Sequence, residues 1–299
     1  MRFAKYHGTG NDFVMIEDLD DRLELTPEVI ASLCDRRFGV GADGLIRVVR
    51  GHGGLDSMAE ADFFMDYYNA DGEAAEMCGN GIRCLAKLVY DGGLTDAVEL
   101  DVATRAGLKH VALETANGAV ERVTVDMGPP SFERKAIGMS GEPTETFIGQ
   151  PLKVGGRTFT ATAVSMGNPH CVLFLEDSDD LARMDVPRLG GVVENLSDLF
   201  TNRVNVEFVK PVDGVLETRV WERGSGDTFA CGTGACAALV ASSLAGVVAR
   251  RGKVRFPGGL LDLVWGEDDR VMMTGPAVCV YKGEVDDDWL AAASRGRQQ

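Results

Sequence analysis

The segment NADGEAAEMCGNG, residues 69–81, decides the fold, because a second segment, ERGSGDTFACGTG, residues 222–234, follows the same pattern. Each has a polar residue nine positions before a cysteine, and each cysteine opens a Cys-Gly-x-Gly turn that leads into an apolar stretch. Strand-like alternation precedes both segments, at 63–68 and 216–221. A repeat of this kind predicts a chain built from two similar halves.

A second pair of turns supports the duplication. Gly10-Asn11 lies about 65 residues before Cys78, and Gly167-Asn168 lies about as far before Cys231. We therefore expect two halves related by an approximate twofold axis, with a seam between them.

The remaining patterns favour strands over helices. Strands are expected at 98–103, 120–127, 158–164, 171–175, 204–209, 260–265 and 271–274. Helices are expected at 27–34, after the cap-like Thr26, at 80–90, before Gly92-Gly93, and at 233–248, which is apolar enough to be buried. This mixture predicts an α+β fold in which each half wraps a mixed or antiparallel sheet around a central helix.

Length and charge restrict the classes of function. The 299 residues suit two domains of ordinary size, and the apolar content of 45% allows a real core. The net charge of −16 disfavours nucleic acid and anionic membrane surfaces as partners. No apolar run has the roughly 20 residues that a membrane span needs.

The cysteines indicate a reducing compartment. No export signal is present, so we expect a cytoplasmic protein whose seven cysteines stay reduced, five of them as small core residues. No Cys-x-x-Cys pair exists and no two histidines lie at helical spacing, which argues against a metal site. The acidic stretch 176–180 is expected to be a solvated loop.

The two cysteine turns have a common physical property. The first N–H groups of a helix have no intrahelical partner and carry the positive end of its dipole. Glycines let that backbone approach a ligand closely, so each turn can hold a carboxylate. A cysteine at that position is expected to have a pKa below its usual value of about 8.5.

Two such turns facing each other suit inversion of an α-carbon. A carboxylate held near Gly79-Asn80 and Gly232-Thr233 would place its neighbouring carbon between the sulfurs of Cys78 and Cys231. One thiolate removes the α-proton while the opposing thiol protonates the other face. A single base would return the proton to the same face, so inversion without a cofactor requires two. A redox disulfide between the two cysteines is a lesser alternative.

Polar residues around the turns predict a pocket for a substrate that is polar at both ends. They share short, turn-like sequence contexts and comprise Asn11, Asn69, Asn168, Asn205, Glu222 and Arg223. The fork of Arg223 suits a second carboxylate. His170 could orient or deprotonate one thiol, with Glu222 or Glu76 assisting.

Cofactor motifs are not convincing. HGTGN, residues 7–11, lacks the ending of a nucleotide-binding P-loop, and the glycines at 39–44 precede a strand-like stretch, 45–49, where a dinucleotide fingerprint requires a helix. No lysine stands in a context that argues for pyridoxal phosphate. We expect a protein that needs no cofactor and acts on a small molecule.

Taken together, the motifs resemble the diaminopimelate epimerase family. The segments that carry the resemblance are HGTGNDF (7–13), NADG (69–72), MCGNG (77–81), MGNPH (166–170), RVN (203–205), ERGSGDT (222–228) and ACGTGAC (230–236). They follow in order from residue 1 to about residue 283.

The resemblance implies interconversion of LL- and meso-diaminopimelate in lysine and cell-wall precursor synthesis, with Cys78 and Cys231 as the acid/base pair. It implies that the reacting carboxylate is held by Gly79, Asn80, Gly232 and Thr233, and that the substrate is contacted by Asn11, Asn69, Asn168, Asn205, Glu222 and Arg223. It also implies a homodimer and two domains, 1–128 with about 276–299, and 129–275, with the active site in the cleft between them. Gly44 stands where some members carry glutamine, so it is left out of the site.

Two alternatives remain open at this point. One is another cofactor-independent racemase on the same scaffold, acting on proline, histidine or an acidic amino acid. The other is an amino-acid binding protein with inactive cysteines, which the survival of both complete cysteine turns disfavours.

Overall fold

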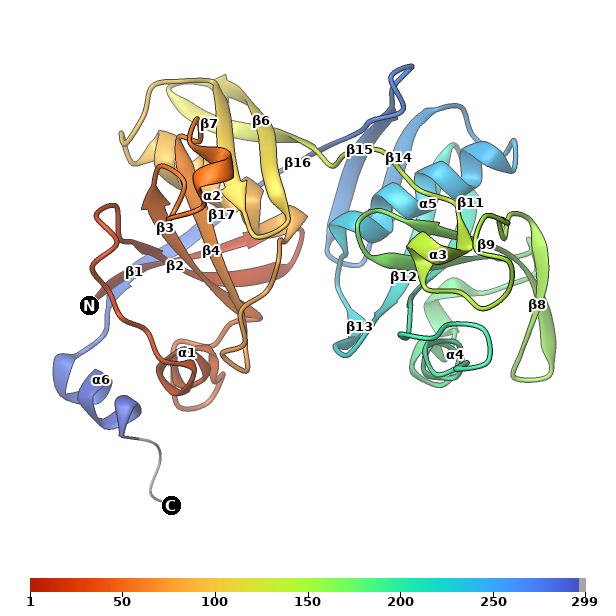
Figure 1. The fold of residues 1–299 in the computed structure, drawn as a ribbon, viewed down its shortest axis with the longest axis horizontal. Coiled ribbons are helices and arrows are strands. Elements are labelled where there is room, and N and C mark those ends of the chain that lie inside the picture. Colours follow the sequence, from red (N-terminus) through yellow and green to blue (C-terminus); the bar gives the residue numbers. More distant parts are fainter. Residues whose placement is uncertain (296–299) are drawn as a thin grey trace. The chain divides into compact units, whose positions relative to one another are not determined.

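The computed structural model describes residues 1–295. The chain forms two compact units: a first unit of Met1–Val125 with the C-terminal segment from Gly275, and a second unit of Asp126–Thr274. In Figure 1 the blue C-terminal strand and helix lie in the same unit as the red N-terminus. The two ends of the chain therefore build one unit, and the middle of the chain builds the other.

The first unit is dominated by strands. Its strands and helices, in chain order, are β1 (Arg2–Gly8), β2 (Asn11–Glu17), α1 (Pro27–Cys34), β3 (Gly44–Arg50), β4 (Phe63–Asn69), α2 (Gly79–Asp91), β5 (Glu99–Thr104), β6 (Gly107–Ala116), β7 (Ala119–Asp126), β17 (Val278–Glu284) and α6 (Asp287–Ser294). A short 3-10 helix, η1 (Asp56–Met58), precedes β4.

The second unit has a similar composition. Its elements are α3 (Arg134–Ile137), β8 (Gln150–Val154), β9 (Arg157–Ser165), β10 (Pro169–Phe174), η2 (Leu181–Arg183), α4 (Val186–Glu194), β11 (Asn205–Val212), β12 (Val215–Glu222), β13 (Gly226–Thr228), α5 (Gly232–Leu244), β14 (Arg251–Phe256), β15 (Gly259–Trp265) and β16 (Val271–Gly275).

The two units repeat one pattern of strand pairing. In the first, β1–β2 is antiparallel, β2–β3 parallel, β3–β4 antiparallel, β4–β5 parallel and β5–β6 antiparallel. The second repeats this order with β9–β10, β10–β11, β11–β12, β12–β14 and β14–β15. The pairing of β17 with β1 is matched by that of β8 with β9. The predicted α+β fold with two similar halves is confirmed.

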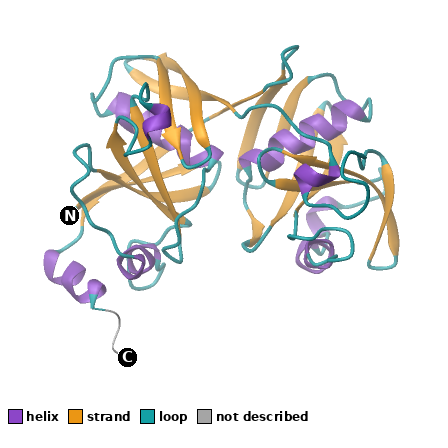
Figure 2. Ribbon diagram, viewed as in Figure 1, coloured by secondary structure: helices purple, strands orange, loops and turns teal. Residues whose placement is uncertain are grey.

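One helix occupies the centre of each unit. Helix α2 contacts β1, β2, β3, β6 and β17, and α5 contacts β9, β10, β11, β12, β14 and β15. Figure 2 shows each of these helices among the strands of its own unit. Most residues of α5 are buried, which explains why its sequence is apolar on all sides.

The predicted helices are found, with one boundary error. Helix α1 covers the predicted residues, and Oγ1 of Thr26 accepts a hydrogen bond from the N–H of Val29 at 3.5 Å. Helix α2 agrees with its prediction to within one residue at each end. The prediction that the third helix continues to residue 248 is wrong, because α5 ends at Leu244 and Gly246 adopts a left-handed conformation at φ +70°.

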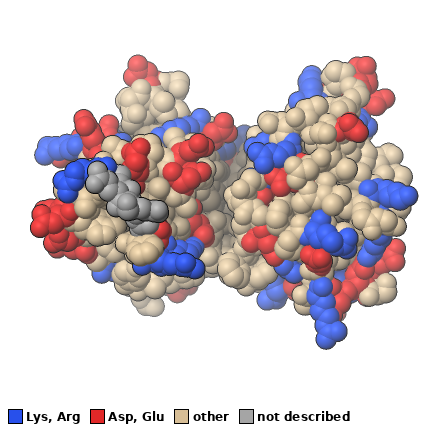
Figure 3. Space-filling view, turned by 90° about the horizontal axis from the view of Figure 1, so that it is seen from below, with Lys and Arg blue, Asp and Glu red and all other residues tan. Residues whose placement is uncertain are grey.

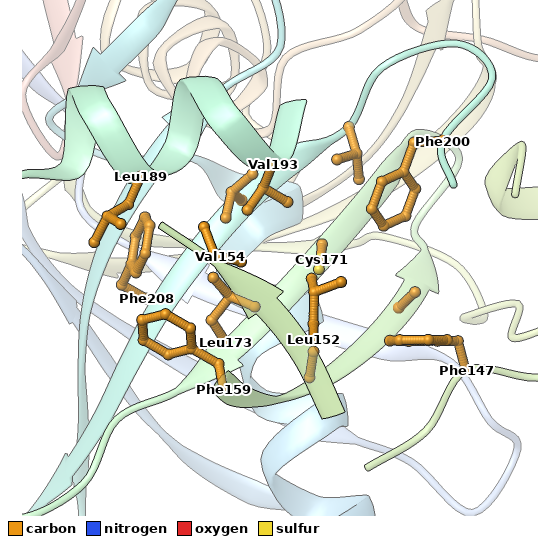
Figure 4. Close-up of a cluster of buried hydrophobic side chains, with 14 of the residues drawn as sticks. Phe147, Leu152, Val154, Phe159, Cys171, Leu173, Leu189, Val193, Phe200 and Phe208 are labelled. Atoms are coloured by element: carbon orange, nitrogen blue, oxygen red, sulfur yellow. The ribbon is translucent and has the colours of Figure 1, made fainter. Parts of the chain in front are cut away.

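Helix α4 was not predicted, because two glycines interrupt its apolar pattern. Leu189 and Val193 of this helix point into a buried cluster that includes Phe208 (Figure 4). Gly190 allows close packing on β12, since an added Cβ would lie 2.4 Å from the Cβ of Trp221. The glycines that weaken the helix signal are therefore part of its packing.

The surface carries charges of both signs, and Figure 3 shows acidic and basic side chains interspersed on the visible face of each unit. The acidic stretch 176–180 is a loop, as predicted, in which Asp179 is paired with Arg157. None of the helices in residues 1–295 has the length and apolar character that a membrane span requires.

The other cysteines are mostly core residues. Cys34, Cys84, Cys171 and Cys236 are buried, whereas Cys279 is only half-buried, so the prediction of five core cysteines is wrong by one. Burial raises the pKa of Cys34 and of Cys84 to about 12. Both thiols therefore stay protonated in the folded protein at pH values where an unfolded thiol, with a pKa of about 8.5, ionises.

Because these two thiols stay protonated in the folded protein, we expect the free energy of unfolding to fall at alkaline pH. The stabilisation is fully present below about pH 8.5 and is lost as the pH rises toward the folded-state pKa of about 12, by about 1.4 kcal/mol per pH unit for each thiol. Urea unfolding between pH 7.5 and 10.5 measures the free energy of unfolding at each pH. Its decrease with pH should be shallower for Cys84→Ala than for wild type. Val89→Ala, which leaves a cavity in the same helix, should be less stable at every pH but should show the same pH dependence as wild type. Parallel curves for wild type and Cys84→Ala would contradict the assignment.

Candidate active site

Both cysteines of the repeated turns are the N-cap residues of the central helices. Cys78 precedes α2 with φ −134° and ψ 117°, and Cys231 precedes α5 with φ −124° and ψ 122°. These nearly identical extended conformations confirm that each cysteine stands at a helix N-terminus. The first N–H groups of each helix follow the cysteine directly in the chain and can hold an anion.

The second glycine of each Cys-Gly-x-Gly turn is required by close packing. A Cβ on Gly81 would lie 2.6 Å from Cδ1 of Ile46, and a Cβ on Gly234 would lie 2.7 Å from Oε1 of Glu207. The glycines therefore let each helix N-terminus lie directly on a side chain of the sheet below it.

In the first unit a buried polar network supports the cysteine turn. Oδ1 of Asn80 accepts hydrogen bonds from Oγ1 of Thr9 at 3.3 Å and from Nη2 of Arg83 at 3.0 Å. The Arg83 guanidinium, which is fully buried, also donates to the carbonyl of Gly79 at 3.0 Å. The network joins the α2 N-terminus to the β1–β2 turn that carries Asn11.

In the second unit the sulfur of Cys231 has several polar neighbours. It accepts a hydrogen bond from the N–H of Gly234 at 3.4 Å and lies 3.4 Å from Oγ1 of Thr233. The carboxylate of Glu222 lies close enough to influence the pKa of this thiol, and its Oε1 accepts from Thr228 at 2.5 Å. Glu222 is therefore an electrostatic neighbour of the predicted acid/base group.

The expectation of a lowered pKa is wrong for Cys231. Burial, together with the neighbouring carboxylates of Glu222 and Glu207, raises the pKa of this thiol well above its ordinary value. The hydrogen bonds from Thr233 and Gly234 act in the opposite direction but do not outweigh burial. Burial also raises the pKa of Glu222. Burial therefore favours the protonated form of the Cys231 thiol.

His170 is buried and held by two side chains. Its Nδ1 lies 2.7 Å from Oε1 of Glu207, and its Nε2 lies 2.9 Å from Oδ1 of Asn168. Burial raises the pKa of Glu207, and the adjacent His170 partly offsets this. His170 also lies close enough to Glu222 to influence the pKa of that carboxyl group. Glu76, the other predicted assistant, is exposed.

Asn205 and Arg223 complete the polar group of the second unit. The N–H of Arg223 donates to Oδ1 of Asn205 at 2.8 Å, and Nδ2 of Asn205 donates to the carbonyl of Pro169 at 2.8 Å. The Arg223 guanidinium donates to the carbonyl of Asn202 at 3.2 Å and pairs with no carboxylate in residues 1–295. It is therefore available to an acidic group of a ligand.

In the first unit Asn11 and Asn69 stand at the ends of strands. Oδ1 of Asn11 is buried, and no residue within 1–295 gives it a hydrogen bond. Oδ1 of exposed Asn69 accepts from the hydroxyl of Tyr67 at 3.1 Å. A buried acceptor without a partner is costly, so Asn11 is a candidate contact for a ligand donor.

The structure adds residues that sequence reasoning did not single out. Glu207 follows two residues after Asn205 in a strand, and its only sequence signal is an acidic residue inside the apolar run VNVEFV. Thr9, Arg83 and Thr228 join the site through side-chain hydrogen bonds. In the described part of the chain, no three His, Cys, Asp or Glu residues are grouped to hold a metal ion.

The two thiols should differ in their reaction with iodoacetamide. Cys78 is partly exposed, whereas Cys231 is buried and has a raised pKa, which reduces its thiolate fraction. At pH 8 we expect Cys78 to be alkylated at least about tenfold faster. Peptide mapping by mass spectrometry measures both rates in one sample, with buried Cys171 as an internal control. Equal rates at Cys78 and Cys231 would contradict the difference in environment.

Solved structures with a similar fold define the class. A probable proline racemase from Agrobacterium radiobacter K84 aligns with a TM-score of 0.68 and 15% identity, covering 99% of this chain and 95% of that one. A PhzF-family phenazine biosynthesis protein from Bacillus anthracis aligns with a TM-score of 0.66 and 17% identity, covering 96% and 99%. The chain therefore has the α+β fold shared by these racemase and PhzF proteins.

Sequence comparison identifies the family within this class. The family model for diaminopimelate epimerase matches residues 3–133 and 162–280. Diaminopimelate epimerase from Leptospira biflexa is 44% identical over 289 residues, covering 96% of this chain and 99% of the relative. The enzyme from Acetivibrio thermocellus is 43% identical over 288 residues, with the same coverage. This chain belongs to the diaminopimelate epimerase family.

Proposed function

We propose that this protein is an isomerase that converts LL-diaminopimelate to meso-diaminopimelate without a cofactor, for lysine and cell-wall precursor synthesis. Cys78 and Cys231 are the paired base and acid. The observation that carries the proposal is a repeated arrangement. In each unit a cysteine is the N-cap of a buried helix, and the surrounding strands pair in the same order. Membership of the family supports the choice of substrate.

Helix N-terminal amides hold the carboxylate next to the reacting carbon. They belong to Gly79 and Asn80 in one unit and to Gly232 and Thr233 in the other. Loss of the α-proton places negative charge on this carbon and its carboxylate, and fixed N–H donors stabilise that charge in the transition state.

One turnover leaves the total number of protons on the substrate and the two cysteines unchanged. The thiolate of one cysteine takes the α-proton and becomes a thiol, while the other thiol gives its proton to the opposite face and becomes a thiolate. The raised pKa of Cys231 keeps that sulfur protonated and able to donate. After one inversion the roles are exchanged, ready for the reverse direction.

Polar side chains recognise the second amino-acid group of the substrate. Their proposed members are Asn11, Asn69, Asn168, Asn205, Glu222 and Arg223. The Arg223 guanidinium has no carboxylate partner in residues 1–295, which supports its assignment to the distal carboxylate. Oδ1 of Asn11 receives no hydrogen bond from the same residues and suits an ammonium donor. His170 and Glu222 are auxiliary residues that orient the Cys231 side.

Domain boundaries near residues 128 and 276 and a homodimer are part of the same proposal. Strand β17 exposes Val278, Val280 and Tyr281, with exposed fractions of 41–56%, and this apolar strip supports association through β17. Sedimentation of wild type and Val280→Lys tests the dimer.

A cytoplasmic location is supported by the free state of all seven cysteines.

Proton NMR of LL-diaminopimelate with the reduced protein in heavy water tests the function, with no cofactor added. We expect loss of a Cα–H signal together with appearance of the meso isomer. Exchange without inversion would contradict the two-base mechanism. No change with folded protein would overturn the substrate assignment, and proline, histidine and acidic amino acids would then be tested.

A further inference from the structure

A buried polar pair in the second unit has an apolar counterpart in the first. The parallel pairs β10–β11 and β2–β3 have the same register relative to their Gly-Asn turns. By this register Phe13 is equivalent to His170, and Ile46 is equivalent to Glu207. The equivalence is confirmed by packing, because Ile46 lies below Gly81 as Glu207 lies below Gly234.

The polar pair is completely buried. His170 and Glu207 are both 0% exposed, and Nδ1 lies 2.7 Å from Oε1. Oε2 of Glu207 is also buried and receives no hydrogen bond from residues 1–295. An apolar pair of the same shape would avoid these costs, as the first unit demonstrates with Phe13 and Ile46.

The pair connects the core to a residue of the site. Nε2 of His170 lies 2.9 Å from Oδ1 of Asn168, which stands in the β9–β10 turn. An ionised carboxylate and an amide oxygen only accept hydrogen bonds, so the two contacts require an N–H on each ring nitrogen. Nδ1 donates to Glu207, and this holds the ring so that Nε2 donates to Oδ1 of Asn168. The orientation of the Asn168 amide then depends on a carboxylate in the neighbouring strand.

We propose that Glu207 is a positioning residue, which holds the Nδ1 proton of His170 and thereby fixes the side chain of Asn168 for the substrate. The proposal rests on the function proposed above, in which Asn168 contacts diaminopimelate. Glu207 does not touch the substrate itself.

A double-mutant cycle tests whether Glu207 acts through Asn168. Glu207→Met removes the acceptor at similar volume, and we expect about a tenfold loss in kcat/KM, mainly through a higher KM. In the Asn168→Ala background the same change should cost less than about twofold. Glu207→Gln, which keeps an acceptor oxygen, should restore most of the loss. Equal losses in both backgrounds would overturn the proposal. Glu217→Met, on adjacent strand β12, is the control and should retain activity.

A second variant separates positioning from stability. His170→Phe with Glu207→Ile installs the pair of the first unit, and we expect a urea midpoint at or above that of wild type, with greatly reduced activity. A large loss of stability would show that the pair is a structural requirement and would contradict the proposal.

NMR of protein with ¹⁵N-labelled histidine gives a readout independent of turnover. Four histidines are present, and His170→Asn assigns the signal of interest. We expect a proton bound to Nδ1 of His170 in wild type and Glu207→Gln, and its loss from Nδ1 in Glu207→Met. An unchanged signal in Glu207→Met would overturn the positioning role. If diaminopimelate were not epimerised at all, the proposed function would fail while this measurement still decided the contact.

Discussion

Replacing Cys231 by serine is expected to reduce kcat/KM for epimerisation by about 10³-fold, and replacing Cys78 by serine should have a similar effect. Acid/base groups of this kind contribute about 10² to 10⁴-fold, and a serine hydroxyl is a much weaker acid than a thiol. In the proposed mechanism each sulfur serves one face of the α-carbon, so neither can replace the other. The rate is measured by circular dichroism or by NMR with the pure LL isomer.

Cys236→Ala provides the matched control. Cys236 is buried in α5, five residues after Cys231, and lies inside the helix, not at its N-terminus. We expect this variant to retain catalysis, with at most a modest loss of stability. Near wild-type activity in Cys78→Ser or Cys231→Ser would refute the two-thiol mechanism, whereas the control shows that removal of a thiol from this helix is tolerated.

Arg223→Ala is expected to reduce kcat/KM for diaminopimelate by about 10²-fold or more. The guanidinium has no carboxylate partner within residues 1–295, so a substrate carboxylate would gain a charged, bidentate contact there. Arg223→Lys should recover little, because an ammonium cannot reproduce the fork. Steady-state kinetics of both variants measure the effect.

Arg255→Ala is the control for Arg223. Arg255 forms a partly exposed ion pair with Glu217 at 3.0 Å, and pairs of this kind contribute little to stability. We expect its kinetics to match wild type. If Arg223→Ala left KM and kcat unchanged, the distal carboxylate would have to be recognised elsewhere.

Local sequence signals predicted the elements that carry the cysteines. The N-caps at Cys78 and Cys231 follow from turn glycines, which precede an apolar helix pattern over a few residues. The same locality explains the correct prediction of α1 from Thr26 and Pro27. Helix α4 was missed because its glycines are favoured by packing against Trp221, which is distant in sequence.

The sequence by itself determined that the chain is duplicated and that each half presents a cysteine at a helix N-terminus, because capping and strand alternation are decided by neighbouring residues. Only the tertiary structure decided the environment of each thiol. Glu222 and Glu207, from separate strands, lie near enough to raise the pKa of Cys231, and burial there reverses the effect of the helix N-terminus on that pKa. Desolvation depends on which distant side chains cover a group, and no local pattern contains that information.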